Sequence, residues 1–391
     1  MKRPPTAHPS YLRRHEDDRP TLGLADLETP VPVVDLDRLT DNLDRMAAYA
    51  ALHGLALRPH VKTHKSRRIA ADQTRLGATG LTCATPREME AMADVADDLL
   101  LAHPPLGPSK LARLVTLPRT AALTVAVDSI EAIEQLASAA HAADREIGVY
   151  IEIDVGMHRV GVPGATDAAE LAKLVRRRDP LRYAGIAFYP GHIRAPVGEQ
   201  AAQLERLSAD LARALQELDR AGVPPAIVSG GSTPIAWRAH EVAGMTEVRP
   251  GTYVYNDRTT AEIGACAWDD CALTVLATVV STAVPGQAVV DAGSKALGRE
   301  PLRGANGEGF GALLDRPDVV VSRMSEEHGI LDLSRADWRP QVGDQVRIVP
   351  NHVCIVTHLF DSVYGVRDTR VETRWAVDAR GRERVETEVN V

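Results

Sequence analysis

Aromatic residues are scarce in this sequence of 391 amino acids, of which they make up only 4%. A surface that stacks nucleic-acid bases needs several rings, so a single-strand-binding function is disfavoured. The core must instead be built from Ala, Val, Leu and Ile, and hydrophobic residues as a whole reach 45% of the chain. With 25% charged residues, this composition is typical of a globular protein with a full core.

An excess of positive charge and long apolar runs are also missing. The 45 basic and 53 acidic residues give a net charge of −8, which argues against binding of nucleic acid or of an anionic membrane. No apolar stretch approaches the roughly 20 residues that span a bilayer. Residues 1–5 lead into polar sequence, so we expect no secretory signal. The cysteines form no CxxC pair, and we expect a reduced, cytoplasmic protein.

Short apolar runs alternate with longer amphipathic segments between about residues 31 and 255. The predicted strands are residues 31–35, 55–62, 80–84, 98–102, 122–127, 146–154, 183–189, 226–229 and 247–248. Most of them precede a predicted helix. About eight β/α units in roughly 220 residues favour a TIM-type (β/α)8 barrel with parallel strands over an open doubly wound sheet.

The pattern changes after about residue 257 to β-branched runs separated by Gly, Pro and Asp. Strands are predicted at residues 275–284, 287–291, 319–324, 345–349, 353–359 and 371–377. We therefore expect a barrel domain at residues 28–257. A smaller, mainly antiparallel β domain is predicted from residues 258–391 together with residues 1–27. The tail after Asp378 is predicted to be a final hairpin or to be loose.

Basic residues gather where the second predicted strand ends. Catalytic groups of a barrel lie at the carboxyl ends of its strands. Here residues 58–65 read Arg-Pro-His-Val-Lys-Thr-His-Lys. Among other cations and low-dielectric walls Lys62 loses its proton more easily, as a Schiff-base lysine must. A solvated basic loop is the alternative.

Two further candidates follow later strands. Arg159 follows the sixth predicted strand, and His192, which is either structural or catalytic, follows the seventh.

Two glycine turns indicate a bound anion. Residues 230–233 read Gly-Gly-Ser-Thr after the eighth predicted strand, and residues 249–253 read Arg-Pro-Gly-Thr-Tyr. Bare backbone N–H groups and hydroxyls at such turns bind phosphate. The sequence has neither a P-loop nor a GxGxxG after its first strand. Two such turns and a lysine at one barrel mouth suggest a phosphorylated cofactor bound through an amine, and pyridoxal 5'-phosphate fits best.

The segment Asn-His-Val-Cys at residues 351–354 is the candidate metal site of the second domain. On a strand, residues two apart share a face, so His352 and Cys354 can bind one ion. A thiolate with an imidazole suits Zn²⁺ better than Mg²⁺. The alternative is that Cys354 packs in the core, as a free cysteine usually does.

Taken together, these segments resemble the alanine racemase-like, fold-type-III pyridoxal-phosphate enzymes, and among them the D-threonine aldolase/D-serine dehydratase group. The resemblance spans roughly residues 28 to 365 and includes residues 291–297 and 327–329. It implies that Lys62 carries the cofactor covalently and that Arg159 and Arg249 face the cofactor ring. The backbones expected to hold the phosphate are those of Gly231, Ser232, Thr233, Gly251 and Thr252.

The same resemblance implies a metal-dependent reaction. His352 and Cys354 would bind a divalent metal (Zn, Mn or Mg) beside the β-hydroxyl of a D-amino acid substrate. The protein is expected to be a homodimer, because members of the group commonly are. Lys62 and His192 are the expected catalytic residues, and His192 would remove the β-hydroxyl proton or hold a water on the metal.

Two lyase reactions remain open at this point. In retro-aldol cleavage, which we favour because His192 supplies a second base, a D-threonine-like substrate gives glycine and an aldehyde. In the alternative, a D-serine or D-3-hydroxyaspartate dehydratase gives a 2-oxo acid and ammonia. The His and Cys pair is that of the dehydratases, whereas many aldolases of the group have His and Asp. A non-catalytic pyridoxal-phosphate carrier and a racemase fit less well, because neither requires the metal pair.

Overall fold

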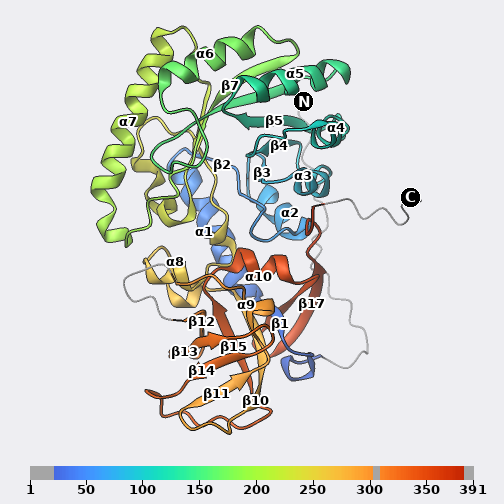
Figure 1. Cartoon of the computed structure of the whole chain (residues 1–391), viewed down its shortest axis with the longest axis vertical. Helices are drawn as coiled ribbons and strands as arrows, with labels where there is room; N and C mark the ends of the chain where they lie inside the picture. Colours follow the sequence, from blue (N-terminus) through green and yellow to red (C-terminus); the bar gives the residue numbers. More distant parts are fainter. Residues whose placement is uncertain (1–21, 303–308, 383–391) are drawn as a thin grey trace, which may run out of the picture.

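The computed structural model describes residues 22–302 and 309–382. Two sheets organise these residues, one of eight parallel strands and one of nine mainly antiparallel strands. Figure 1 shows the parallel sheet and its helices in the upper half and the nine-stranded sheet in the lower half. Predictions for residues 1–21 and for the tail from residue 383 lie outside the described residues.

The eight-stranded sheet is the predicted barrel. Its strands are β2 (Ala56–Leu57), β3 (Leu81–Cys83), β4 (Asp98–Leu101), β5 (Ala122–Val127), β6 (Ile147–Ile153), β7 (Leu181–Phe188), β8 (Ile227–Gly230) and β9 (Glu247–Val248). They pair in the order β2-β9-β8-β7-β6-β5-β4-β3. A parallel bridge between His60 and Thr82 joins the two edges, and the Val61 N–H donates to the Thr82 carbonyl at 2.9 Å. The parallel pairing predicted from the sequence is thereby confirmed.

Helices cover the outside of the barrel strands. They are α1 (Leu36–Leu52), α2 (Arg67–Arg75), α3 (Pro86–Met92), α4 (Pro108–Val115), α5 (Ile130–Ala142), α6 (Ala165–Arg176), α7 (Ala201–Arg220) and the 3-10 helix η3 (Thr233–Glu241). The short helix α8 (Arg258–Glu262) follows the last barrel strand. All seven residues of β6 are buried, as expected of a strand with side chains inside the barrel and helices outside. None of the helices in the described part of the chain has the length and apolar character needed to cross a bilayer.

One predicted barrel strand belongs to the other sheet. β1 (Val31–Asp35) is a strand, but it pairs with β10 (Leu273–Ser281) and β16 (Ser362–Arg367) of the second domain. Counting it as the first barrel strand was wrong, because an apolar run followed by a helix looks alike whichever sheet it joins. α1 begins directly after it, where the Asp35 side chain accepts the Asp37 and Arg38 N–H groups, and returns the chain to the barrel.

The nine-stranded sheet forms the second domain. Its other strands are β11 (Gln287–Val290), β12 (Gly311–Leu313), β13 (Arg316–Met324), β14 (Gly329–Asp332), β15 (Gln345–Pro350) and β17 (Arg370–Ala376). The short helix α9 (Ser294–Leu297) follows β11. In the N-terminal segment the Leu24 N–H donates to the Thr369 carbonyl at 2.9 Å, so the described part of that segment contacts this domain.

A second correction concerns the predicted strand at residues 353–359. These residues form a helix, α10 (Val353–Leu359), with His352 as its N-cap. Val353, Val356 and Thr357 are buried, which is helical spacing, and the β-branched composition had masked it. His352 and Cys354 therefore do not share the face of a strand. Figure 1 shows α10 and α8 at the boundary between the two halves of the molecule.

Candidate active site

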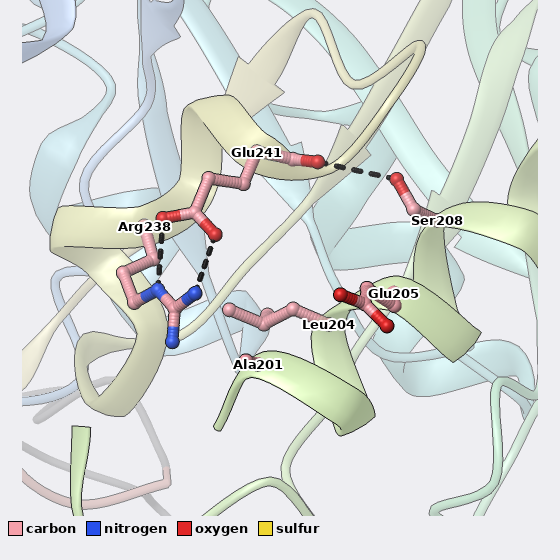
Figure 2. Close-up of a pocket in the computed structure, with 6 residues that line it drawn as sticks. All are labelled: Ala201, Leu204, Glu205, Ser208, Arg238 and Glu241. Atoms are coloured by element: carbon pink, nitrogen blue, oxygen red, sulfur yellow. Dashed lines mark hydrogen bonds and ion pairs between the residues drawn. The ribbon is translucent and has the colours of Figure 1, made fainter. Parts of the chain in front are cut away.

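The main cavity opens at the carboxyl ends of the barrel strands. Its volume is about 590 Å³, a size typical of small-ligand sites. Residues at or after the ends of β2, β3, β4, β6, β7, β8 and β9 line it, and residues of the second domain, among them His352 and Cys354, complete the wall. A smaller cavity of about 250 Å³ lies between α7 and η3 (Figure 2), where the charged group of Arg238 is already paired with Glu241.

The loop that carries Lys62 is fixed on both sides. Lys62 and His60 both line the cavity. The His60 N–H donates to the Pro250 carbonyl at 2.9 Å, and a buried ion pair joins Lys65 to Glu88. Burial and the charges of Lys62 and Arg249 hold the pKa of His60 well below its usual value. Lys62 is therefore held in the cavity wall beside an uncharged imidazole.

The two predicted anion-binding turns lie side by side. The Thr233 hydroxyl accepts the N–H groups of Gly251 and Tyr253, each at 3.3 Å. Gly231 has a φ of +87°, a conformation that favours glycine. A Cβ on Gly251 would lie 3.1 Å from the His60 carbonyl oxygen, so a side chain there would press on the lysine loop.

Ser232 supplies an independent sign of a ligand at these turns. Its hydroxyl is buried, and no described residue provides it with a hydrogen-bond partner. A buried polar atom normally has a partner, so a phosphate oxygen at this position would satisfy the hydroxyl. Thr252, the last of the predicted phosphate residues, also lines the cavity.

The ring of Tyr189 lies close to two cations that the sequence singled out. The Lys62 Nζ is 5.7 Å from the centre of its ring, and the Arg159 guanidinium is 4.7 Å from it. Arg249 is buried and donates from Nη2 to the Phe188 carbonyl at 2.9 Å. Its Nε has no partner among the described residues. Lys62, Arg159 and Arg249 thus surround one space.

The predicted metal ligands meet in the cavity although they do not lie on a strand. His352 Nδ1 is 3.2 Å from Asp257 Oδ2, and the Cys354 sulfur is 3.2 Å from the Thr63 hydroxyl. The charge of Cys354 raises the pKa of His352. Burial alone raises the pKa of the Cys354 thiol, but His352 and Thr63 lower it to about 7. The sulfur is therefore readily available as a thiolate, which suits a soft or borderline metal ion.

These two side chains are a partial ligand set. Within the described ranges, no group of three or more His, Cys, Asp or Glu residues is arranged to hold an ion. A metal bound by His352 and Cys354 would draw its remaining ligands from water or substrate. Asp257 is buried, and by contacting Nδ1 it leaves Nε2 of His352 for such an ion.

His192 is not brought to the cavity. Its side chain is exposed, and the cavity wall passes through Tyr189, Gly191 and Arg194 instead. The ring lies outside against Gly156, where a Cβ would come within 3.4 Å of it. We expected His192 in the active site because it follows the end of a barrel strand. The chain turns at Gly191 and His192, however, and the turn directs the His192 side chain away from the cavity.

Several cavity residues were not predicted from the sequence. Asp257 and Arg194 had no signal, because each lies in a loop whose position depends on the packing of other elements. Tyr189 stood at a strand end before Pro-Gly, and His60 stood in the basic segment, so both carried a signal that was not used.

A barrel that presents a lysine beside two anion-binding turns, followed by a mainly antiparallel β domain, defines an alanine racemase-like protein. The sequence comparison agrees. Residues 34–259 match the family described as alanine racemase, N-terminal domain, and residues 272–366 match a putative serine dehydratase domain. The chain belongs to the alanine racemase N-terminal domain family and carries this second domain.

The relatives include both an aldolase and a dehydratase, the two kinds of lyase between which the sequence does not decide. D-threo-3-hydroxyaspartate dehydratase of Delftia sp. (strain HT23) is 37% identical over 85% of this chain and 92% of its own length. The crystal structure of D-threonine aldolase from Filomicrobium marinum is 35% identical, with a TM-score of 0.85, over 92% of this chain and 98% of that one. A cysteine-to-alanine mutant of D-threo-3-hydroxyaspartate dehydratase, described as metal-free, is 36% identical with a TM-score of 0.82, over 90% and 98%.

Proposed function

We propose that this protein is a pyridoxal-phosphate- and metal-dependent lyase that acts on D-3-hydroxy amino acids. The observation that carries the proposal is the meeting of Lys62, the two anion-binding turns and the pair His352 and Cys354 in one cavity of about 590 Å³. The similarity to an aldolase and to a dehydratase over most of the chain supports the same reaction class.

The residues around Lys62 fit the cofactor. Lys62 would hold it covalently, Arg159 and Arg249 would face its ring, and the phosphate would lie on the turns formed by Gly231, Ser232, Thr233, Gly251 and Thr252. The unpartnered Ser232 hydroxyl and Arg249 Nε support this assignment. When bound, the cofactor supplies an electron sink for bond cleavage at Cα.

The pair His352 and Cys354 fits a divalent metal, and the thiolate favours zinc over manganese or magnesium. Such an ion supplies Lewis-acid chemistry at the β-oxygen of the substrate. The protein would position the two ligand atoms for this ion. Asp257 would orient the imidazole, and the Thr63 hydroxyl lies within hydrogen-bond distance of the sulfur. A relative's metal-free mutant, in which a cysteine was replaced, supports a metal in the group.

Retro-aldol cleavage is the leading reaction, because the similarity to a D-threonine aldolase covers 92% of this chain with a TM-score of 0.85, whereas His192 no longer supports it; dehydration is the second candidate. In cleavage the Cα–Cβ bond breaks, the β-hydroxyl loses its proton, Cα gains one, and D-threonine gives glycine and acetaldehyde. In dehydration Cα loses a proton and Cβ loses hydroxide, and hydrolysis then gives 2-oxobutanoate and ammonia. The His and Cys pair and the 37% identity to a dehydratase favour this second reaction. Lys62 would move a proton at Nζ in either reaction, and its position in the cavity wall supports this role.

Product analysis tests the proposal. The cofactor-loaded protein is incubated with D-threonine and Zn²⁺, Mn²⁺ or Mg²⁺, and the products are identified. Glycine with acetaldehyde supports the aldolase, and 2-oxobutanoate with ammonia supports the dehydratase. No product from any D-3-hydroxy amino acid would overturn both reactions and favour a cofactor carrier.

The cofactor assignment has its own test. The absorbance of the bound cofactor should disappear in Lys62→Ala, and a wild-type protein without that absorbance would contradict the cofactor assignment.

We further propose that the protein is a cytoplasmic homodimer. The four cysteines are unpaired, which is typical of a reducing compartment. The dimer is expected from the family resemblance. Size-exclusion chromatography with light scattering tests it, and a monomer at all micromolar concentrations would contradict it.

A further inference from the structure

Two arginines hold the segment that follows β7, and they differ in their other contacts. Arg194 donates from Nε to the Gly191 carbonyl at 2.6 Å. Arg238, on η3, donates from Nη1 to the Val197 carbonyl at 3.2 Å. Arg238 also donates to both carboxylate oxygens of Glu241, at 2.8 and 2.6 Å, as Figure 2 shows. Each guanidinium has one contact with this segment, but among the described residues only Arg238 has a carboxylate partner.

Arg194 lies in the wall of the main cavity and is half-buried. Within residues 22–302 and 309–382, neither of its terminal nitrogens has a hydrogen-bond or ion-pair partner. A planar guanidinium matches a carboxylate with two parallel hydrogen bonds, and such a pair is among the stronger polar contacts. The Nε contact with Gly191 fixes the plane of the group and leaves Nη1 and Nη2 for a ligand.

Other cations of the cavity already have contacts or a proposed role. Arg249 is buried against the Phe188 carbonyl, and Arg159 lies over the ring of Tyr189. Lys62 is assigned to the cofactor. Arg194 is the cavity arginine that has no role in holding the cofactor and whose terminal nitrogens have no partner among the described residues, so a carboxylate entering the cavity would find a well-matched partner there.

We propose that Arg194 binds a carboxylate of the substrate. The inference rests on the proposed function, because it takes the substrate to be a D-3-hydroxy amino acid. The carboxylate is either the α-carboxylate, which every such substrate has, or a second one on the β-carbon, as in 3-hydroxyaspartate. In the first case Arg194 is a general binding residue. In the second it sets the preference for an acidic substrate over D-threonine.

Kinetics with two substrates show whether Arg194 binds the α-carboxylate or the β-carboxylate. We compare Arg194→Gln and Arg194→Lys with the matched control Arg238→Gln, which removes the η3 guanidinium that contacts the same segment but does not line the main cavity. Arg194→Gln should lower kcat/KM about 10- to 100-fold, mainly through KM. A loss with both D-threonine and D-3-hydroxyaspartate identifies the α-carboxylate, and a loss with D-3-hydroxyaspartate alone identifies the β-carboxylate. Unchanged kcat/KM for both substrates overturns the proposal.

Lysine keeps the positive charge but lacks the two parallel N–H donors of the guanidinium, so Arg194→Lys should recover part of the kcat/KM that Arg194→Gln loses. This variant also decides the question if Arg194→Gln fails to fold, which circular dichroism would show. Arg194→Lys would then have a raised KM with unchanged kcat, whereas wild-type kinetics would overturn the proposal. Arg238→Gln should stay within about threefold of the wild type for both substrates, since solvent-exposed pairs contribute little. A larger loss in the control than in Arg194→Gln would assign the effect to the segment rather than to a carboxylate.

A binding experiment separates this inference from the proposed function. D-Aspartate and D-2-aminobutyrate lack the β-hydroxyl, and their binding to the cofactor-loaded protein is measured by calorimetry. Arg194→Gln should weaken the binding of D-aspartate about 10- to 100-fold. The wild type could form no product from any D-3-hydroxy amino acid while Arg194→Gln still binds D-aspartate more weakly than the wild type does. In that case the proposed function fails and the carboxylate site stands. If the wild type is active and Arg194→Gln matches it in both assays, the carboxylate site fails and the function stands.

Discussion

The hydroxyl of Thr63 lies 3.2 Å from the sulfur of Cys354, so the residue next to Lys62 contacts the proposed metal ligand across the domain boundary. A second contact reinforces this one, because the Thr357 hydroxyl of α10 donates to the Thr63 carbonyl at 2.6 Å. The lysine loop of the barrel and the first turn of α10 therefore hold each other in place. The proposed cofactor-binding and metal-binding residues therefore meet at one junction.

Replacing Thr63 with Val should weaken the metal site. Valine keeps the shape of the side chain but removes the hydrogen bond that favours the Cys354 thiolate. A net loss of about 1 kcal/mol corresponds to about fivefold weaker binding of Zn²⁺. Competition with a chromophoric chelator measures this affinity. Thr63→Ser keeps the hydroxyl and should bind Zn²⁺ as the wild type does. Wild-type affinity in Thr63→Val would show that the hydroxyl does not act on the sulfur.

Asp257→Asn should lower the affinity for the metal by about 10- to 100-fold, because an oriented carboxylate makes a ligating histidine more basic. Asp257 Oδ2 contacts His352 Nδ1, while Oδ1 accepts the Thr260 N–H at the start of α8. Asparagine keeps an oxygen acceptor for the α8 contact and loses only the 3.3 Å hydrogen bond from the Val353 N–H to Oδ2, so the loss should appear in Zn²⁺ competition with at most a small decrease in Tm.

The matched control for Asp257→Asn is Asp35→Asn. Asp35 likewise accepts N–H groups at the start of a helix, α1, but does not line the cavity. Its replacement should leave Zn²⁺ affinity unchanged. Equal losses of affinity in the two variants would mean that Asp257 acts through helix stability and not through His352.

Much of the barrel could be predicted from the sequence, because each strand–helix unit has its own apolar period and the strand ends define one face. This reasoning predicts that Lys62, Gly231 and Arg249 lie near one another, and all three line the same cavity. It failed for β1 and α10, where local composition does not decide which sheet a strand joins or whether Val-rich sequence is helical. Asp257 could not be found for the same reason, since its contact with His352 spans 95 residues of sequence.

His192 gives the sharpest difference between the sequence and the structure. As the base for the β-hydroxyl it would contribute about 10²- to 10⁴-fold to kcat. Because its side chain is exposed and outside the cavity wall, we expect His192→Asn to keep kcat within about threefold of the wild type. Steady-state kinetics with D-threonine measures it, and Lys62→Ala is the inactive reference. A hundredfold loss with unchanged folding would restore His192 as the base.

His64 should make the stability of the lysine loop depend on pH. The side chain is fully buried, and its Nδ1 accepts the Ser66 N–H at 3.1 Å, so the neutral imidazole is held in place. Burial, aided by the charge of Lys65, lowers the pKa of His64 from 6.5 to about 3. Below pH 6.5 the unfolded chain binds a proton that the folded protein does not. The free energy of unfolding must therefore fall as the pH drops from 6.5 toward 3, by up to about 1.4 kcal/mol per pH unit.

The variant His64→Asn isolates this contribution. Asparagine offers an oxygen to the Ser66 N–H and does not titrate, so other acid-sensitive groups cancel when the two proteins are compared. Urea unfolding at pH 7 and at pH 5 gives the free energy of unfolding of each. The wild type should lose about 2 kcal/mol more than the variant between these values, because one extra proton binds to its unfolded chain. An equal loss in both proteins would mean that His64 is protonated in the folded state, with its charge satisfied inside the loop that carries Lys62.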